Sequence, residues 1–261
     1  MSNDIEDTVI LNEYSLHCIS SIALGDRKDQ QDSIGIMQKD TNTTLAIIAD
    51  GMGGLAGGKL ASQAAVDAFC GHFMNDEITN IPAFLYNQAI SCDHMIADLK
   101  DAHGAPLHAG STLVSTYIHN DELHFVSVGD SRLYLLRDSR LIQVTKDHNY
   151  NMILKEARKN MSEEQFAQES KKGESLISYL GMDGLKYIDV SKEAIRLQPH
   201  DYLLMCSDGL YKRLKPEQIK AIMKDVIYTG LEHTILTLQE EAKLAKGRKQ
   251  DNTSIILAGY Y

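Results

Sequence analysis

Short runs of hydrophobic residues separated by polar turns fill the first part of the chain. Between Ser15 and Ala49 the runs read CISSIAL, SIGIMQ and TLAIIA, with polar turns such as KDTNT between them. Runs of this length that are rich in β-branched residues and bounded by turn formers are typical of strands. Three strands are therefore predicted. Two helices are predicted next, because Lys59 to Met74 places apolar residues at helical spacing and Pro82 can open a helix that runs to about Asp101.

The rest of the chain continues in blocks of one element type. From Ser111 to Val144 the runs STLVSTYI, ELHFVSVG, RLYLLR and RLIQVT are divided by turn formers, which predicts a meander of strands. The stretch from His148 to Gly181 is helical in pattern and strongly polar, and we expect residues 150–181 to form a mobile flap. Strands are predicted near 187–197 and 202–206, helices near 216–227 and 231–245, and a last strand at 253–257. Blocks rather than strict alternation favour an α+β fold of four layers, α-β-β-α, in which helices flank two antiparallel sheets.

The composition is that of an ordinary globular protein, with 43% hydrophobic and 24% charged residues among 261. No repeat or proline-rich linker marks a boundary, so we expect a single domain over residues 1–261. The longest apolar stretches are far shorter than the ~20 residues of a membrane helix, and the first residues, MSNDIEDT, lack the basic start and apolar core of a secretory signal. We therefore expect a cytoplasmic monomer without a membrane partner.

The cysteines and the net charge exclude some classes of site. Cys18, Cys70, Cys92 and Cys206 show no CxxC spacing, which argues against a disulfide framework and against a thiolate zinc site. The formal charge of −10 argues against nucleic acid as a partner, since such a surface needs clustered Lys and Arg. The same acidity suits divalent cations, although in many proteins the excess lies on solvated faces.

One arrangement recurs along the chain: an apolar strand that ends in an Asp with a Gly beside it. It occurs at Asp50 in LAIIADGMGG, at Asp130 in LHFVSVGDSR and at Asp208 in YLLMCSDGL, and Asp251 stands directly before the last predicted strand in QDNTSIIL. A strand delivers its last carboxylate to the sheet edge, and Gly lets backbone approach a ligand. These carboxylates could converge on Mg²⁺ or Mn²⁺, which prefer oxygen ligands. The alternative for each Asp is a plain turn, although the three glycines of DGMGG exceed what a turn needs.

The order of the motifs resembles one known family. Arg27 and Asp32 lie in DRKDQQDS, and DGMGG, GSTLV, GDSRLY, TKDHN, CSDGL and DNTS follow, so that the series covers about Ser15 to Leu257. The set resembles the type 2C class of metal-dependent serine/threonine protein phosphatases, in its compact bacterial form. The resemblance implies hydrolysis of phosphoserine or phosphothreonine in other proteins, and a cognate Ser/Thr kinase whose action the enzyme reverses.

The resemblance also implies a role for each ligand of a two-metal centre. Asp50 would bridge two Mg²⁺ or Mn²⁺ ions, the Gly51 carbonyl would add a ligand or a water-mediated contact, and Asp208 and Asp251 would hold the ions from the other side. A water that bridges two cations loses its proton near neutral pH and can attack phosphorus in line. Several segments would thereby make one site.

The resemblance assigns roles to three further residues, and two of them have an alternative. Arg27 would grip the phosphate with its planar fork, and the alternative is a surface ion pair with a neighbouring Asp, Asp26 or Asp29. Asp32 is assigned to catalysis beside Arg27. Asp130 would hold an optional third ion together with the Asp of CSDGL, and the alternative is a turn Asp between two hairpin strands.

Two positions depart from the family's pattern or leave a role open. Gln31 stands where the family commonly has Glu, so a neutral amide replaces a carboxylate near the second ion. Met52 stands where many eukaryotic members carry a His, and the sequence names no general acid for the leaving group. The ten histidines are expected to be surface or structural residues. Two alternatives to an active protein phosphatase remain: a catalytically weak or inactive phosphoprotein-binding regulator, and a small-molecule phosphoesterase or nuclease with the same metal chemistry.

Overall fold

The computed structural model describes residues 5–9, 16–52, 56–247 and 249–261. The strands of its first sheet are β1 (Ile5–Val9), β2 (Leu16–Ala23), β8 (Arg132–Arg137), β9 (Arg140–Gln143), β12 (Asp201–Cys206) and β13 (Thr253–Tyr260). Those of the second are β3 (Asp32–Asp40), β4 (Thr43–Met52), β5 (Gly110–Ser111), β6 (Leu113–His119), β7 (Glu122–Val128), β10 (Asp189–Val190) and β11 (Ile195–Arg196). The strand order is β1-β2-β13-β12-β8-β9 in the first sheet and β10-β7-β6-β4-β3 in the second, where β11 joins β7 and β5 joins β4.

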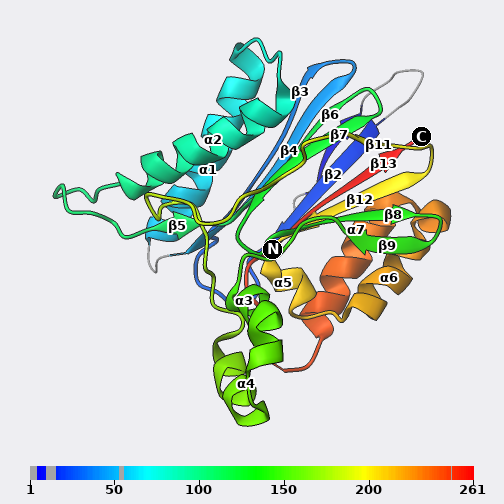
Figure 1. Ribbon diagram of the computed structural model, residues 1–261. Coiled ribbons are helices and arrows are strands. Elements are labelled where there is room, and N and C mark those ends of the chain that lie inside the picture. The colour runs from blue at the N-terminus through cyan, green and yellow to red at the C-terminus, as the bar shows by residue number, and fades with distance from the viewer. Residues whose placement is uncertain (1–4, 10–15, 53–55, 248) are drawn as a thin grey trace.

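Helices lie on the outer faces of both sheets (Figure 1). Their bounds are α1 (Ala56–Asn75), α2 (Ile81–Ala97), α3 (Tyr150–Ala157), α4 (Glu163–Glu169), α5 (Asp208–Tyr211), α6 (Pro216–Lys224) and α7 (Val226–Leu244). Helices α1 and α2 cover the second sheet, α6 and α7 cover the first, and α3 and α4 project from one end. No helix among the described residues is long and apolar enough to span a bilayer.

The alternation of side chains along the central strands builds three layers of hydrophobic core. On β4, Leu45 and Ile47 pack under α1 and α2, whereas Ile48 packs between the two sheets. On β12, Met205 packs between the sheets and Leu204 packs under α6 and α7. Successive side chains of a strand point to opposite faces, so a strand that is covered on both sides reads as a continuous apolar run. The predicted α+β sandwich of two antiparallel sheets flanked by helices is confirmed.

Several elements differ from the sequence-based expectation. Strand β1 was not predicted, and residues 187–197 contribute only the two-residue strands β10 and β11. The last strand extends beyond its predicted end to Tyr260. Helix α7 contains Gly230 with φ 80° and ψ 170°, so its regular part begins where the second C-terminal helix was predicted. Two of the glycines of DGMGG, Gly53 and Gly54, lie outside the described residues.

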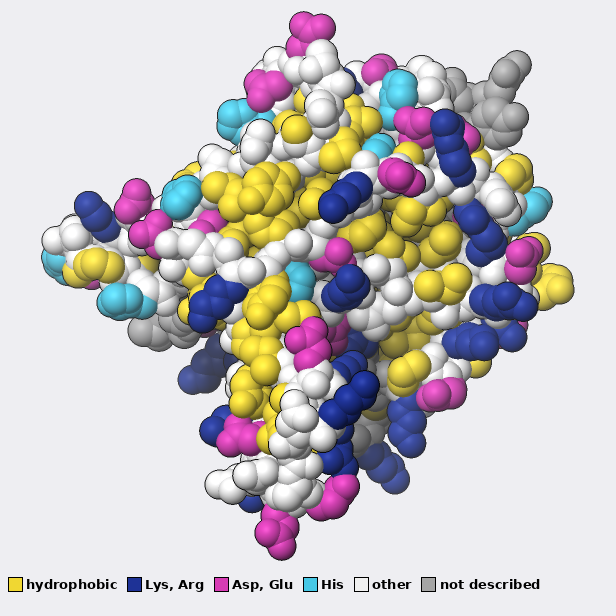
Figure 2. Space-filling view, viewed as in Figure 1, with side chains coloured by type: hydrophobic (Ala, Val, Ile, Leu, Met, Phe, Trp, Pro, Cys, Tyr) yellow, Lys and Arg dark blue, Asp and Glu magenta, His cyan; other side chains and the backbone are white. Residues whose placement is uncertain are grey.

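The segment of residues 150–181 forms a lobe of short helices whose end is tied back to the body of the molecule. It contains α3, α4 and two 3-10 turns, and Figure 2 shows a run of hydrophobic side chains where the lobe joins the body. Leu180 pairs with Ser111 through two backbone hydrogen bonds of 3.1 and 2.8 Å. The carboxylate of Asp93 on α2, which is fully buried, then accepts backbone N–H groups of Gly181 at 2.7 Å, Met182 at 2.8 Å and Gly184 at 2.7 Å. One buried carboxylate thus fixes the exit of the lobe.

Candidate functional site

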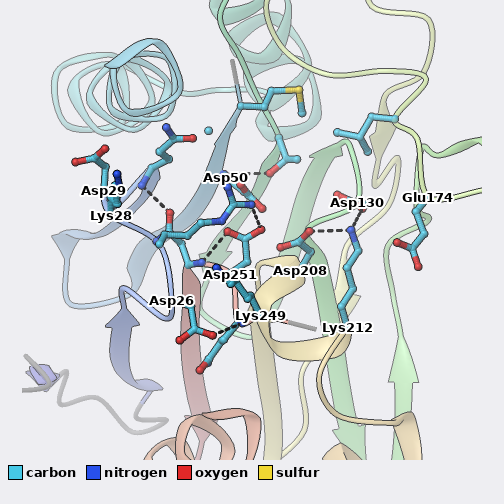
Figure 3. A pocket seen from close by; sticks show the side chains of 18 residues that line it. Asp26, Lys28, Asp29, Asp50, Asp130, Glu174, Asp208, Lys212, Lys249 and Asp251 are labelled. Atoms are coloured by element: carbon cyan, nitrogen blue, oxygen red, sulfur yellow. Dashed lines mark hydrogen bonds and ion pairs between the residues drawn. The ribbon is translucent and has the colours of Figure 1, made fainter. Parts of the chain in front are cut away.

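A cleft of about 710 Å³ lies at one end of the two sheets. The end of β4, the turn between β7 and β8, the end of β12 and the start of β13 meet there, together with the loop before β3. Six of the seven predicted site residues line this cleft, namely Arg27, Asp50, Gly51, Asp130, Asp208 and Asp251. Figure 3 shows Asp50, Asp208 and Asp251 turned toward the same space, which supports the predicted convergence of strand-end carboxylates.

Asp50 and Gly51 are held by the strands on both sides of β4. The N–H of Asp50 donates to Thr112 Oγ1 at 3.1 Å, and the N–H of Thr112 donates to the Asp50 carbonyl at 2.8 Å. On the other side, the N–H of Gly51 donates to the Gln31 carbonyl at 3.2 Å. A Cβ on Gly51 would lie 2.0 Å from the backbone oxygen of Gly58, which no side chain can avoid. Glycine is therefore required because backbone crowds this strand end.

Asp208 and Asp251 are fixed by the pairing of β12 with β13. The N–H of Ser207 donates to the Ser254 carbonyl at 3.0 Å, and the N–H of Ser254 donates to Ser207 Oγ at 3.0 Å. Asn252 follows Asp251, and its side chain donates to the carbonyl of Leu24 at 2.9 Å. The Asn252 amide oxygen also accepts the N–H of Gln31 at 2.9 Å. These contacts tie the two carboxylates to the loop that carries Arg27.

Asp32, which the resemblance assigns to catalysis, lies beneath the cleft and is not among the residues that line it. It is 1% exposed and stands opposite Asp50 in the register of β3 with β4. One carboxylate oxygen accepts the hydroxyl of Ser207 at 2.8 Å, whereas the buried Oδ1 has no hydrogen-bond partner among the described residues. Burial raises the pKa of Asp32 to about 6, and the charges of Asp208 and Asp251 add to the effect. Its place behind the other carboxylates points to positioning rather than contact with a substrate.

The carboxylates of the cleft concentrate negative charge. Withdrawal from water, followed by the charges of its neighbours Asp32, Asp208, Asp130 and Asp251, raises the pKa of Asp50 well above its usual range. Burial likewise raises the pKa of Asp130 to about 6, and the nearby Lys212 opposes this increase. Like charges gathered this closely need positive partners.

Two basic side chains already partner these carboxylates. Arg27, whose side chain is 58% exposed, forms an ion pair with Asp251. This partner differs from the predicted alternative, a pair with Asp26 or Asp29. Asp26 accepts the N–H of Gln250 at 2.8 Å. Lys212 lies 2.7 Å from Asp208. The cleft therefore contains both the anionic and the cationic groups that the sequence predicted, and Lys212 in addition.

The donor set suits hard divalent cations. All candidate ligands are oxygens, and the crowded backbone at Gly51 and the unpartnered buried oxygen of Asp32 both lie beside the clustered carboxylates. Within the described ranges, no three His, Cys, Asp or Glu side chains are close enough to hold one ion by themselves. Mg²⁺ commonly takes few protein carboxylates and keeps several waters.

Several positions at the site carry roles that the sequence analysis did not assign. Thr112, Ser207 and Asn252 hold the ligand-bearing strand ends, and Lys212 forms part of the cleft wall. A signal existed for Lys212, since it stands four residues after Asp208 and such pairs face each other on a helix. No histidine of the described chain lines the cleft, and His148 is buried behind Gly129, whose N–H donates to His148 Nδ1 at 3.2 Å.

Comparisons with known proteins identify the family. A sequence model of the family described as protein phosphatase 2C matches residues 24–246. The serine/threonine phosphatase stp of Listeria welshimeri is 27% identical over 241 residues, which are 85% of this chain and 94% of that protein. The serine/threonine protein phosphatase PstP of Mycobacterium tuberculosis is 30% identical over 224 residues, which cover 82% of this chain and 40% of that protein.

Solved structures show the same architecture. The S. agalactiae serine/threonine phosphatase superimposes with a TM-score of 0.79 at 23% identity, over 98% of this chain and 99% of that one. The catalytic domain of PstP in complex with two manganese ions gives a TM-score of 0.76 at 25% identity, over 95% of this chain and 99% of that one. The chain belongs to the protein phosphatase 2C family and is a metal-dependent serine/threonine protein phosphatase.

Proposed function

We propose that Asp50, the Gly51 carbonyl, Asp208 and Asp251 hold two divalent ions in the cleft, and that this centre hydrolyses phosphoserine and phosphothreonine in proteins. The observation that carries the proposal is the convergence of strand-end carboxylates from separate segments on one open cleft. Bound there, Mg²⁺ or Mn²⁺ would supply an activated water as nucleophile and neutralise charge on the phosphoryl oxygens. The all-oxygen donor set is compatible with either ion.

The chain's own residues orient the substrate. Arg27 extends into the cleft with an exposed guanidinium, so its fork can exchange Asp251 for two oxygens of a phosphate. Asp32 acts as a positioning residue, because its carboxylate accepts a hydrogen bond from the hydroxyl of Ser207, the residue directly before Asp208. Glu174 and Leu176 of the 150–181 segment line the same cleft, and we propose that this segment is a flap that contacts the protein substrate.

The test is phosphate release from a phosphothreonine peptide with and without Mn²⁺. We expect Mn²⁺-dependent release that is lost in Asp208→Asn, since removal of one ligand charge weakens the centre. The control is Asp98→Asn, which changes an exposed carboxyl at the end of α2 and should match the native chain. Equal release by Asp208→Asn and the native chain would contradict the assigned ligands.

A second candidate, a phosphoprotein-binding regulator with little turnover, is favoured by Gln31. This amide lines the cleft where the family commonly carries a carboxylate. Metal binding without turnover on any phosphopeptide would favour the regulator. Release from nucleotides or small phosphate esters, with none from phosphopeptides, would favour a small-molecule phosphoesterase.

The physiological setting is also a proposal. We propose that the enzyme reverses the action of a cognate Ser/Thr kinase in the cytoplasm, and that it acts as a monomer. The four cysteines are free, which supports a reducing compartment. Light scattering on the purified chain tests the monomer, and loss of the chain in cells should raise phosphothreonine on the targets of that kinase.

A further inference from the structure

Lys212 occupies the space between two carboxylates of the cleft. Its Nζ lies 2.7 Å from Asp208 Oδ2 and 3.6 Å from Asp130 Oδ2. Figure 3 shows the Lys212 side chain reaching between these two acidic groups. The side chains of Asp130 and Asp208 are 5% and 18% exposed, so Lys212 meets them within the cleft rather than on an open surface.

The local backbone holds Lys212 in this position. Helix α5 is a single turn that begins at Asp208, and the backbone N–H of Lys212 closes it by donating to the carbonyl of Asp208 at 3.0 Å. Residues four apart on a helical turn face each other, and an acid placed before a base is the favourable order. Asp130 comes from the turn after β7, so the contact joins two segments far apart in the chain.

A divalent ion and this ammonium group would compete for the same oxygens. An ion such as Mg²⁺ lies about 2.0–2.1 Å from its oxygen ligands. Nζ of Lys212 lies 2.7 Å from Asp208 Oδ2, so an ion bound to that oxygen and Nζ would need the same space. Two positive charges at such short separation repel each other strongly. The ammonium already supplies the positive charge that Asp130 and Asp208 need as a pair.

We propose that Lys212 takes the place of a third metal ion between Asp130 and Asp208, so that this chain binds two divalent ions and not three. The inference rests on the proposed two-metal centre. It departs from the sequence-based expectation, in which Asp130 and Asp208 were an optional third site. Asp130 becomes the counter-charge that orients Lys212. Because Lys212 contacts Oδ2 of Asp208, Asp208 keeps its place in the two-metal centre through its other carboxylate oxygen, Oδ1.

The experiment counts Mn²⁺ bound per chain, from the free-Mn²⁺ signal in electron paramagnetic resonance during a titration. The native chain should bind two ions. Lys212→Met removes the charge and keeps an unbranched side chain that is one atom shorter, and it should bind a third ion at least about tenfold more tightly than the native chain does. Lys212→Arg keeps the charge and should bind two.

Asp130→Asn tests the proposal without altering Lys212. In the native background this substitution should leave the count at two, and in the Lys212→Met background it should remove the third ion. A native count of three that falls to two in Asp130→Asn would overturn the proposal, as would a count of two in a folded Lys212→Met chain. A native count of zero would instead refute the two-metal centre, so the two failures are distinguishable.

Discussion

Replacing Asp93 with Asn should loosen the exit of the 150–181 segment. The native carboxylate accepts three backbone N–H groups at 2.7–2.8 Å, two on Oδ1 and one, from Gly184, on Oδ2. The amide of Asn keeps one acceptor oxygen. Its NH₂ group would therefore face either the N–H of Gly184 or the N–H groups of Gly181 and Met182. At least one bond to a charged acceptor is lost, and the other bonds lose the assistance of the charge.

The magnitude follows from these contacts. A hydrogen bond to a charged group contributes ~2 kcal/mol, and loss of charge assistance costs ~0.5 kcal/mol for each of the two remaining bonds. The free energy of unfolding should therefore fall by about 3 kcal/mol, reduced somewhat because a buried charge is itself unfavourable.

Urea unfolding measures the loss, and hydrogen exchange locates it. Amide exchange at Gly181, Met182 and Gly184 should accelerate in Asp93→Asn, while the exchange of β4 stays slow. Asp98→Asn, at the C-terminal cap of the same helix, should change stability by less than about 0.5 kcal/mol. Unchanged stability together with unchanged exchange at the three amides would refute the reasoning.

Three further predictions concern the cleft and its surroundings. Arg27→Lys should lower kcat/KM for a phosphothreonine peptide by about tenfold or more, because an ammonium cannot form the two parallel bonds of the fork, and equal steady-state kinetics would reject that role. Gln31→Glu should raise Mn²⁺ affinity or turnover, because it adds a carboxylate beside the proposed ions. An unchanged Mn²⁺ dependence would show that the native Gln31 weakens neither metal binding nor turnover. Burial lowers the pKa of His148 below 6.5, so the unfolded chain takes up this proton more readily and stability falls as the pH drops below that value. Urea unfolding at pH about 7.5 and about 5.5 should show a larger acid-induced loss in the native chain than in His148→Gln, and equal losses would exclude His148 as the cause.

The site residues that could be predicted from the sequence are those at the ends of strands. Asp50, Asp208 and Asp251 each stand next to a strand that the apolar pattern marks, and a strand fixes where its end residue points. The positions that hold these ends in place were not predictable from spacing. Asn252, for example, contacts Leu24 and Gln31 across more than 200 residues of chain.

Most helices and strands, and the order of the layers, could be predicted from the pattern of apolar and polar residues. The continuous apolar run from Leu45 to Ala49 requires cover on both faces of its strand, and the order of strands and helices in blocks favours a sandwich with outer helices as that cover. Short strands such as β5, β10 and β11 contain too few residues to show a period, so their pairing became visible only in the folded chain. The position of Asp32 beneath the cleft and the contact of Lys212 with Asp130 were likewise visible only in the folded chain. Both depend on how separate segments pack against each other, and no local pattern of residues shows how close those segments come.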